Sequence, residues 1–386
     1  MLLGPRGTGK SFLLEQEFSK IPAKKLLWID LLDADQYEEY LDNPALLAER
    51  VRAGGYKHVV IDEIQKIPAL LDIVHKLIEK LHIQFILSGS SVRKLKRGGG
   101  NLLAGRAFSY NLDPFSHVEL GGRFNLQHVL EYGLLPKLYF PFGPASNKSW
   151  TETEKTRFLQ SYVRTYLQEE ILIEQLVRKI RPFRSFLRVS AQMNGKIVDY
   201  TKIGDDVGVD HKTVGEYFSI LEDTLLGFLL HPYHRSIRKR QGQKPKFYLF
   251  DTGVKRALEQ TLNVPLVQHT TAYGDAFEHF VVLEIRKIAR IIDPDIDLSF
   301  FRTHDGAQEI DLILEKPGKP PVIIEIKSSD RIPDRDIRKL AVFRSDFPKS
   351  DMIILCRERM ARKSGDVLIL HWAEGIRRLL PLPAQV

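Results

Sequence analysis

The chain has 386 residues, of which 43% are hydrophobic and 27% charged, as in an ordinary globular protein of about two or three domains. Its single cysteine, Cys356, excludes an intramolecular disulfide framework and a cysteine zinc site. No apolar run approaches the ~20 residues of a membrane helix, and Met1 to Leu3 leave no room for a signal peptide, so we expect a cytoplasmic protein with no membrane contact.

Residues 1–120 alternate short apolar runs with helical patterns. The runs at 25–30, 58–62 and 84–88 have the length and the nearly unbroken apolar character of strands covered on both faces. The segment 70–78, between two of them, repeats apolar residues at helical spacing. This alternation predicts an α/β domain with a parallel sheet.

The segment from Gly4 to Ser11, GPRGTGKS, matches the phosphate-binding loop pattern G-x-x-x-x-G-K-[ST] at every fixed position. Glycines let backbone N–H groups surround phosphates, and the helix that follows adds its positive N-terminal end. The pattern predicts ATP binding, with Lys10 on the β- and γ-phosphates and Ser11 on Mg²⁺. The expected nucleotide-binding residues are Gly4, Pro5, Arg6, Gly7, Thr8, Gly9, Lys10, Ser11 and Phe12.

An acidic strand end at Asp62 and Glu63 is the expected partner of this loop, because both lie at the carboxyl edge of the sheet. We expect Asp62 to hold Mg²⁺, directly or through water, and Glu63 to polarise the attacking water. Without the loop, the same pair would be typical of a solvated turn. Ser88, at the end of the next strand, is a candidate sensor of the γ-phosphate, and a turn of small residues is the alternative.

Arg106 is the candidate for the arginine that a neighbouring subunit supplies to the transition state in oligomeric ATPases. Arg93 is the second candidate, and a plain surface role is the alternative for both. Only Met1, Leu2 and Leu3 precede Gly4, whereas a phosphate loop normally follows a full strand. Either this strand is cut short or the true start lies upstream, so we expect a weakened floor of the site and poor affinity for ATP.

Residues 121–195 have helical patterns and predict a helical lid or linker, and residues 196–260 predict a winged helix-turn-helix. In the second segment we expect Thr201 to cap one helix, Gly208 to form the turn and Asp210 to cap the next helix. The apolar face predicted for that next helix consists of Val214, Phe218, Leu221 and Leu225.

His211, Lys212 and Thr213 begin this second helix, where recognition helices contact base edges. The segment from His231 to Lys246 then contains basic but no acidic residues, which on a wing would form a phosphate-contacting strip. The net charge of +8 is compatible with nucleic acid, DNA being favoured over RNA, or with an unremarkable basic surface. Contact with protein or between subunits is the alternative. The strip consists of Arg235, Arg238, Lys239, Arg240, Lys244 and Lys246.

Residues 261–386 return to an α/β pattern, with carboxylates in one predicted helix and two predicted strands. Glu278 lies in an apolar helix, Asp311 in a strand, and Glu325 and Lys327 on one face of the next strand. Metal-dependent cleavage of phosphodiesters needs carboxylates that hold Mg²⁺ and a lysine that orients water. Here Asp311 and Glu325 are the expected Mg²⁺ ligands. A salt-bridge cluster and a nuclease-like fold that only binds are the alternatives.

The order of motifs resembles the prokaryotic AAA-type ATPases that carry a C-terminal domain of unknown function, which are related to the archaeal ATPase group within the AAA+ class. The resemblance covers nearly the whole chain. It implies an AAA+ core, a winged helix and a C-terminal domain similar to PD-(D/E)xK nucleases, in which Glu278 would be the helix acid. The motifs are the phosphate loop, IDEIQ at 61–65, SGSS at 88–91, LAGR at 103–106, LDPFSHVEL at 112–120, YGLLP at 132–136 and YLQEEI at 166–171.

Together these features predict a homo-oligomeric ATPase, using ATP and Mg²⁺, that acts on nucleic acid. The alternative is a nucleotide-dependent signalling or assembly switch whose C-terminal region binds a protein partner and has no nuclease activity.

Overall fold

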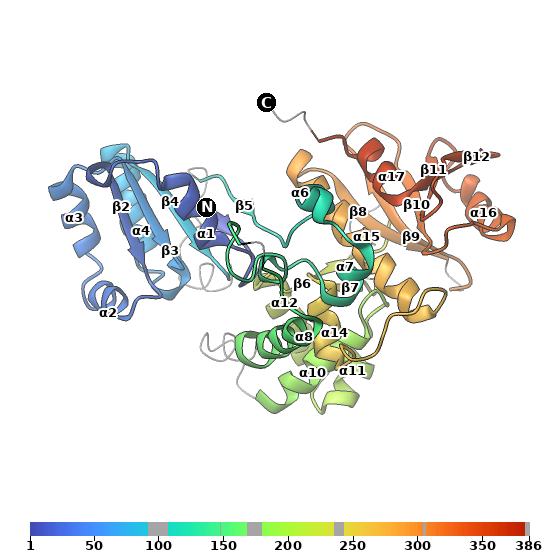
Figure 1. The fold of residues 1–386 in the computed structure, drawn as a ribbon, viewed down its shortest axis with the longest axis horizontal. Helices are drawn as coiled ribbons and strands as arrows, with labels where there is room; N and C mark the ends of the chain where they lie inside the picture. The colour runs from blue at the N-terminus through green and yellow to red at the C-terminus, as the bar shows by residue number, and fades with distance from the viewer. Residues whose placement is uncertain (92–106, 147, 168–179, 235–242, 304–305, 383–386) are drawn as a thin grey trace.

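The computed structural model describes residues 1–91, 107–146, 148–167, 180–234, 243–303 and 306–382. In Figure 1 the N-terminal sheet, in blue, and the C-terminal sheet, in orange to red, lie at opposite ends of the view. Helices of the middle region lie between and below them. A single segment leads from the N-terminal sheet, after β5, to the rest of the chain.

The N-terminal sheet is parallel, and its strand order is β2-β3-β4-β1-β5. The predicted parallel sheet is thus confirmed, and β4 lies between the strand that precedes the phosphate loop and the strand that ends in Asp62. β1 has only two residues but pairs with a neighbour on each side, Leu2 with both Ser88 and Tyr110. The strands are β1 (Leu2–Leu3), β2 (Leu26–Asp30), β3 (His58–Asp62), β4 (Gln84–Gly89) and β5 (Tyr110–Asn111).

Helix α4 packs on this sheet because it presents apolar residues at helical spacing, whereas η1 has no buried residue. In α4 the buried residues Leu70, Val74 and Leu77 share one face and pack in a common core with Val59 and Ile61 of β3. The elements are α1 (Lys10–Phe18), η1 (Ala23–Lys25), α2 (Ala34–Asp42), α3 (Leu46–Gly54), η2 (Ile64–Lys66) and α4 (Leu70–Leu81).

The middle region is helical and contains one two-stranded antiparallel sheet, formed by β6 and β7. Its first elements are α6 (His117–Leu120), η3 (Gly121–Arg123), α7 (Leu126–Tyr132), η4 (Pro136–Leu138), α8 (Glu152–Ser161) and the π-helical η5 (Tyr162–Leu167). They are followed by α10 (Ile180–Gln192), α11 (Tyr200–Val207), α12 (His211–Asp223), β6 (Gly227–Leu230), β7 (Lys246–Leu249) and α14 (Thr252–Glu259).

Three local features were predicted around α11 and α12: the cap of α11, the turn between the helices and the cap of α12. The turn and the cap of α12 agree with the structure. Gly208 has the positive φ of 73° that favours glycine, and the Asp210 side chain accepts from the first amides of α12. The third prediction was wrong: Asp199, not Thr201, caps α11, because its carboxylate accepts from the N–H groups of residues 201 and 202. Leu225 lies beyond the end of α12, whereas the other residues of the predicted apolar face are buried.

The C-terminal region has a six-stranded sheet in the order β12-β13-β11-β10-β9-β8. β8, β9 and β10 are antiparallel neighbours, while β10, β11 and β13 are parallel. No helix in the described ranges is both long and apolar enough to cross a membrane. The elements are α15 (Thr271–Ile292), β8 (Asp297–Arg302), β9 (Glu309–Glu315), β10 (Val322–Ile326), α16 (Asp334–Ala341), η6 (Val342–Arg344), β11 (Asp351–Cys356), β12 (Arg362–Ser364), β13 (Val367–His371) and α17 (Trp372–Leu379).

The segment that follows β5 packs with elements far away in sequence. Leu120, Val129 and Leu134 are buried in the same core as Phe277 and Phe280 of α15. Helices α8 and α10 instead share a core with α11, α12 and α14. The segment after β5 therefore attaches the N-terminal sheet to the C-terminal core.

Candidate functional site

The predicted phosphate loop connects β1 to α1. Gly7 and Gly9 have positive φ angles of 79° and 91°, which glycine adopts without strain. A Cβ atom on Gly4 would overlap the carbonyl oxygen of Leu112, so the loop entrance packs against the segment after β5. The residue before α1, Gly9, contributes no side-chain cap, which leaves amide donors of the first helical turn available to a phosphate.

Lys10 lies inside this loop and is almost fully buried. Its Nζ donates to the carbonyl oxygens of Gly4, at 2.9 Å, and of Pro5, at 3.2 Å. The same Nζ is 4.0 Å from Oε1 of Glu63. Lys10 therefore bridges the loop and the acidic end of β3.

The structure brings the predicted residues Ser11, Asp62 and Ser88 together. Ser11 Oγ donates to Asp62 Oδ2 at 2.5 Å, and the Ser88 hydroxyl donates to Asp62 Oδ1. Ser88 Oγ also accepts from the Glu63 N–H at 3.1 Å. Both Asp62 oxygens thus face hydroxyl groups, which is the kind of oxygen environment that Mg²⁺ prefers.

Glu63 is held by two residues that the sequence did not single out, Gln65 and Ser90. Gln65 Nε2 donates to Glu63 Oε2 and, at 3.0 Å, to Ser90 Oγ, which itself donates to Glu63 Oε2 at 3.1 Å. Glu63 has a φ of 58°, a strained backbone conformation that concentrates at functional sites. The available signal was that Gln65 and Ser90 belong to the motifs IDEIQ at 61–65 and SGSS at 88–91, which carry the family resemblance but assign neither residue a role.

The helical middle region reaches the phosphate loop through Tyr162. Its hydroxyl donates to the carbonyl oxygen of Arg6 at 2.8 Å, and its ring lies 3.4 Å from where a Cβ of Gly7 would be. Phe12, expected among the nucleotide-binding residues, is 48% exposed on α1. The candidate arginines Arg93 and Arg106 lie outside the described residues.

Of the predicted nucleic-acid contacts, His211 and Lys212 are exposed in the first turn of α12. Thr213 is half-buried, and its hydroxyl donates to Asp210 Oδ2 at 2.8 Å as part of the cap. The structure does not describe four further predicted residues, Arg235, Arg238, Lys239 and Arg240.

The assignment of Lys246 to the basic strip was wrong. Lys246 is only 3% exposed, and its Nζ forms ion pairs with Glu309 and, at 3.8 Å, with Glu278 Oε1. The reason is that β7 is buried against the C-terminal region, where acidic side chains receive the ammonium group. Lys244, by contrast, is largely exposed and pairs with Asp199 at 2.6 Å.

The C-terminal carboxylates come together from α15, β9 and β10. The register that pairs Ile324 with Leu312 makes Asp311 and Glu325 neighbours on adjacent strands. Lys327 Nζ donates to Glu325 Oε1 at 2.5 Å, and Asp311 Oδ2 accepts from the backbone N–H that follows Glu325, at 2.8 Å. Glu278 Oε1 accepts from the Tyr248 hydroxyl at 2.8 Å.

The pKa values show that negative charge is crowded at this site. Burial, followed by the charge of Asp311, raises the pKa of Glu278 to about 7 and that of Glu325 to about 8. Burial alone would lower the pKa of Lys327, but Asp311 and Glu325 raise it instead. The cluster therefore attracts protons or other cations near neutral pH.

Whether these residues suit Mg²⁺ depends on their free oxygen atoms. The described contacts use one oxygen each of Glu278, Asp311 and Glu325 and leave the second oxygen of each carboxylate open. Within the described ranges, however, no group of three or more His, Cys, Asp or Glu side chains is arranged to hold a metal ion. The described residues therefore form no closed protein cage for a metal ion.

Three segments of the chain match protein families. Residues 1–121 match the AAA domain family. Residues 138–265 and 273–374 match two domains of unknown function, DUF8612 and DUF4143. The first match, together with the parallel sheet and the phosphate loop, supports an AAA-type P-loop domain at the N-terminus.

Relatives of the whole chain are found in mycobacteria. Uncharacterized proteins of Mycobacterium bovis and Mycobacterium tuberculosis are each 24% identical over 382 residues, which is 95% of this chain and 81% of the relative. Among solved structures, the Aeropyrum pernix ORC1 protein in complex with DNA is 16% identical, with 67% of this chain and 86% of that chain covered and a TM-score of 0.30. Replication initiator DnaA bound to AMPPCP and single-stranded DNA is 15% identical, with coverages of 69% and 88% and a TM-score of 0.28.

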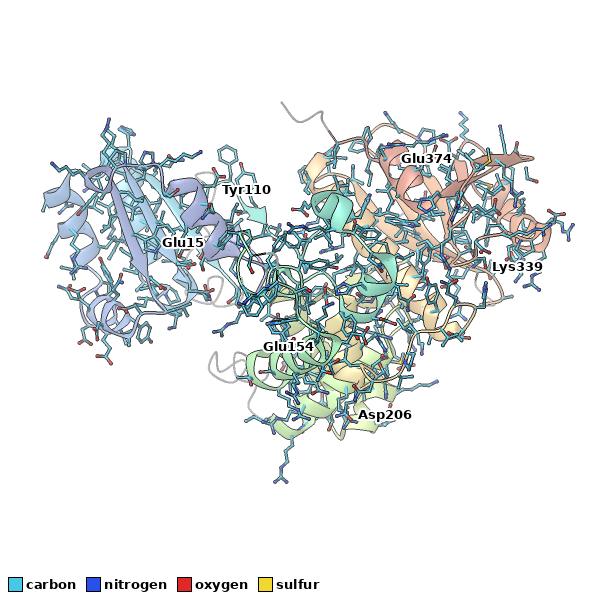
Figure 2. The ribbon with its side chains drawn as sticks, in the orientation of Figure 1. Glu15, Tyr110, Glu154, Asp206, Lys339 and Glu374 are labelled. Carbon is cyan, nitrogen blue, oxygen red and sulfur yellow. The ribbon has the colours of Figure 1, made fainter. Side chains whose placement is uncertain are left out.

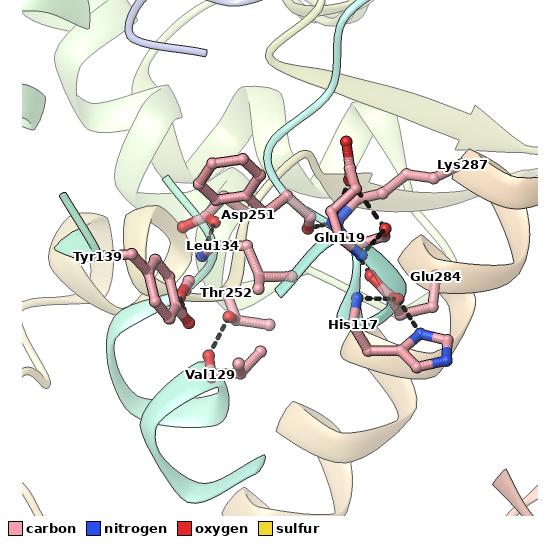
Figure 3. A network of polar contacts seen from close by, with 12 residues as sticks. His117, Glu119, Val129, Leu134, Tyr139, Asp251, Thr252, Glu284 and Lys287 are labelled. Carbon is pink, nitrogen blue, oxygen red and sulfur yellow. Dashed lines mark hydrogen bonds and ion pairs between the residues drawn. The ribbon is translucent and has the colours of Figure 1, made fainter. Parts of the chain in front are cut away.

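A buried polar network holds the segment that follows β5 (Figure 3). Glu284 of α15 is fully buried, and its Oε2 accepts from the backbone N–H of His117 at 2.8 Å and contacts His117 Nδ1 at 2.6 Å. Lys287 Nζ donates to Glu284 Oε1, at 3.1 Å, and to the Phe115 carbonyl oxygen, at 2.8 Å. Nearby, Asp251 Oδ2 accepts from the Leu134 N–H at 2.7 Å. The segment after β5 is thus bonded directly to α15 and, through Leu134, to Asp251 of the middle region.

Proposed function

We propose that the protein is an AAA+ ATPase that binds and hydrolyses ATP and couples its nucleotide state to nucleic-acid contact by the rest of the chain. The observation that carries this proposal is the convergence of Lys10, Ser11, Asp62 and Glu63 at one edge of the parallel sheet. Lys10 comes from the phosphate loop and both acids come from the end of β3, the places where nucleotide chemistry needs them.

Each of these residues has a distinct task in the proposed reaction. Loop amides and Lys10 bind and orient the phosphates, and Ser11 and Asp62 would hold Mg²⁺, which neutralises charge on the phosphate oxygens. Glu63 accepts a proton from the attacking water, while Gln65 and Ser90 keep its carboxylate in position.

Nucleic-acid contact is proposed for α12 and for the basic segment after β6. The exposed His211 and Lys212 lie at the N-terminal end of the second helix of a helix-turn-helix, and the β6–β7 pair follows as a wing would. The net charge of +8 favours contact with phosphates. We propose a homo-oligomer in which Arg106 serves a neighbouring site.

The ATPase rate should therefore rise when DNA is added, and Lys10→Ala should lower both the basal and the stimulated rate at least ~100-fold. A coupled phosphate-release assay with single-stranded DNA, double-stranded DNA and RNA measures this. Lys20→Ala, which replaces an exposed lysine just after α1, is the matched control.

Lys212→Glu should reduce only the stimulation of the ATPase rate by nucleic acid, whereas Lys339→Glu on α16 should not change this stimulation. Equal rates with and without every nucleic acid would contradict the coupling.

A second candidate activity, Mg²⁺-dependent cleavage of phosphodiesters, is favoured by the cluster of Glu278, Asp311, Glu325 and Lys327. Asp311 and Glu325 would hold Mg²⁺, which would activate water and stabilise charge on the phosphate. Lys327, with a third of its side chain exposed, is the residue placed to orient water or a phosphate.

Incubation of plasmid DNA with the protein and Mg²⁺ or Mn²⁺ should produce nicked or linear product, which gel electrophoresis resolves. Asp311→Ala should abolish cleavage, and Asp330→Ala, a replacement of a neighbouring exposed acid, should not. Cleavage that survives Asp311→Ala would show that this cluster is not responsible. Absence of cleavage by the unaltered protein would favour a nuclease-like domain that only binds.

A further inference from the structure

Tyr162 contacts the phosphate loop but lies outside the part of the chain that matches the AAA domain. That match covers residues 1–121, whereas Tyr162 lies in the segment matched to DUF8612, residues 138–265. It is the first residue of the π-helical η5, directly after α8. Turns of π-helix are rare and occur frequently at functional sites. The position of Tyr162 therefore calls for an account of what its contact does to the loop.

The hydroxyl of Tyr162 holds one peptide unit of the phosphate loop. It donates to the carbonyl oxygen of Arg6 at 2.8 Å. This carbonyl belongs to the same planar trans peptide unit as the N–H of Gly7, so the two groups point in opposite directions. The Gly7 N–H is thus directed away from the Tyr162 hydroxyl, and among the described residues it has no protein acceptor. A phosphate oxygen can use such an amide donor.

The ring of Tyr162 packs beside the glycine of the same peptide unit. A Cβ atom on Gly7 would lie 3.4 Å from a ring carbon of Tyr162. Gly7 has a φ of 79°, which glycine adopts without strain, but glycine also has more alternative conformations than any other residue. A contact that keeps such a loop in its binding conformation raises affinity, because less freedom is then lost when the ligand binds.

The middle region anchors Tyr162 itself. Tyr162 is 1% exposed and belongs to the same core as Phe183 of α10 and Phe218 of α12. Its ring centre lies 6.5 Å from that of Phe250, which follows β7. A side chain that is already fixed by packing loses little further entropy when it makes a hydrogen bond. Tyr162 is therefore a rigid support for the loop.

We propose that Tyr162 is a positioning residue of the ATP site, and that it holds the peptide unit of Arg6 and Gly7 in the orientation that receives the phosphates. The inference rests on the ATP binding proposed for the phosphate loop. It makes affinity for ATP a property of two regions, since the loop belongs to the N-terminal domain and its support to the middle region. The core that anchors Tyr162 also contains α12, so the ATP site and the proposed nucleic-acid contact share one structural element.

Tyr162→Phe removes only the hydroxyl and should weaken the binding of ATP to the full chain about 5-fold, the effect of one lost hydrogen bond. The KM for ATP should rise by the same factor while kcat stays nearly constant, because the support acts equally on bound substrate and transition state. Equilibrium binding of a fluorescent ATP analogue measures the affinity. Inorganic pyrophosphate, a competitor without base or ribose, should lose affinity by the same factor.

Tyr217→Phe is the matched control, because Tyr217 is a buried tyrosine of the same core whose ring packs against Phe183 and Phe186. It should leave the affinities for ATP and pyrophosphate unchanged. Phenylalanine fills nearly the same buried space as tyrosine, so both variants should fold, and thermal unfolding checks that they do.

The possible failures of this inference and of the proposed ATPase are distinguishable. Unchanged ATP affinity in Tyr162→Phe, or an equal loss in Tyr217→Phe, would overturn the positioning role. Weaker binding of ATP with unchanged binding of pyrophosphate would overturn it too, because the hydroxyl would then act on the base or ribose. Unaltered protein that binds no ATP would instead overturn the proposed ATPase, and this inference with it.

Discussion

Glu63→Gln should slow ATP hydrolysis about 100-fold or more while leaving ATP binding nearly unchanged, because it removes a proton acceptor and keeps the size of the side chain. Gln65 and Ser90 hold the Glu63 carboxylate, and Lys10 approaches it to 4.0 Å. Glutamine preserves an oxygen for these donors, so the loop and Lys10 should keep their places. Single-turnover hydrolysis and equilibrium binding of a fluorescent ATP analogue measure the two effects separately.

Glu15→Gln is the matched control, since Glu15 is an exposed acid on α1, the helix that follows the phosphate loop (Figure 2). It should change neither hydrolysis nor binding. Retained hydrolysis in Glu63→Gln would assign the general base to another residue. Because the variant holds ATP without consuming it, it should also accumulate any ATP-bound oligomer, which mass determination by light scattering would show. A monomer in every nucleotide state would contradict the proposed homo-oligomer.

What the sequence predicts well in this protein is local. The phosphate loop, the acidic end of β3 and the strands β2, β3 and β4 follow from patterns within a few residues, such as the apolar run that ends at Asp62. The structure then adds what depends on chain segments far apart. Gln65 contacts Ser90 only because β3 and β4 are paired, and this contact has no pattern of its own.

The two clearest errors have different origins. Lys246 was placed on an exposed strip because basic residues precede it, yet Glu278 and Glu309, at least 32 positions away, decide its surroundings. Thr201 was expected to cap α11, but Asp199, two residues earlier, offers a carboxylate, which is a stronger acceptor for the first amides. The burial of Lys246 is a tertiary property that residue order alone does not reveal, whereas the cap of α11 is decided by a local competition between Asp199 and Thr201.

Glu284→Gln should destabilise the C-terminal region by about 3–5 kcal/mol, the usual cost of leaving one partner of a buried ion pair without its counter-charge. The substitution leaves the Lys287 ammonium buried beside a neutral amide, and weakens the bonds to His117. Trp372 is a local probe, since its ring centre lies 4.9 Å from that of His117. Urea unfolding followed by tryptophan fluorescence, in a background with Trp28 and Trp150 replaced by phenylalanine, measures the loss.

Glu374→Gln is the control for this measurement, because it removes a partly exposed ion pair with Arg378 on α17 and should cost less than about 1 kcal/mol. Equal losses of unfolding free energy in the two variants would show that burial does not strengthen the ion pair of Glu284. The same network joins His117, in the segment that packs against the phosphate loop entrance, to α15. Glu284→Gln should therefore also weaken any effect of nucleotide on the C-terminal region.

The pH dependence of the unfolding free energy tests whether the charge of Glu284 stabilises the folded protein. Burial alone would raise the pKa of Glu284, but Lys287 and His117 outweigh it and lower the pKa below its ordinary value of 4.5. The folded state therefore binds the proton less readily than the unfolded state, and the stabilisation is fully present above about pH 4.5 and is lost as the pH falls through the lowered pKa. The difference in unfolding free energy between the unaltered protein and Glu284→Gln should accordingly be largest near neutral pH and shrink below pH 4.5. A difference that stays constant down to pH 3 would mean that the carboxylate charge is not what stabilises this junction.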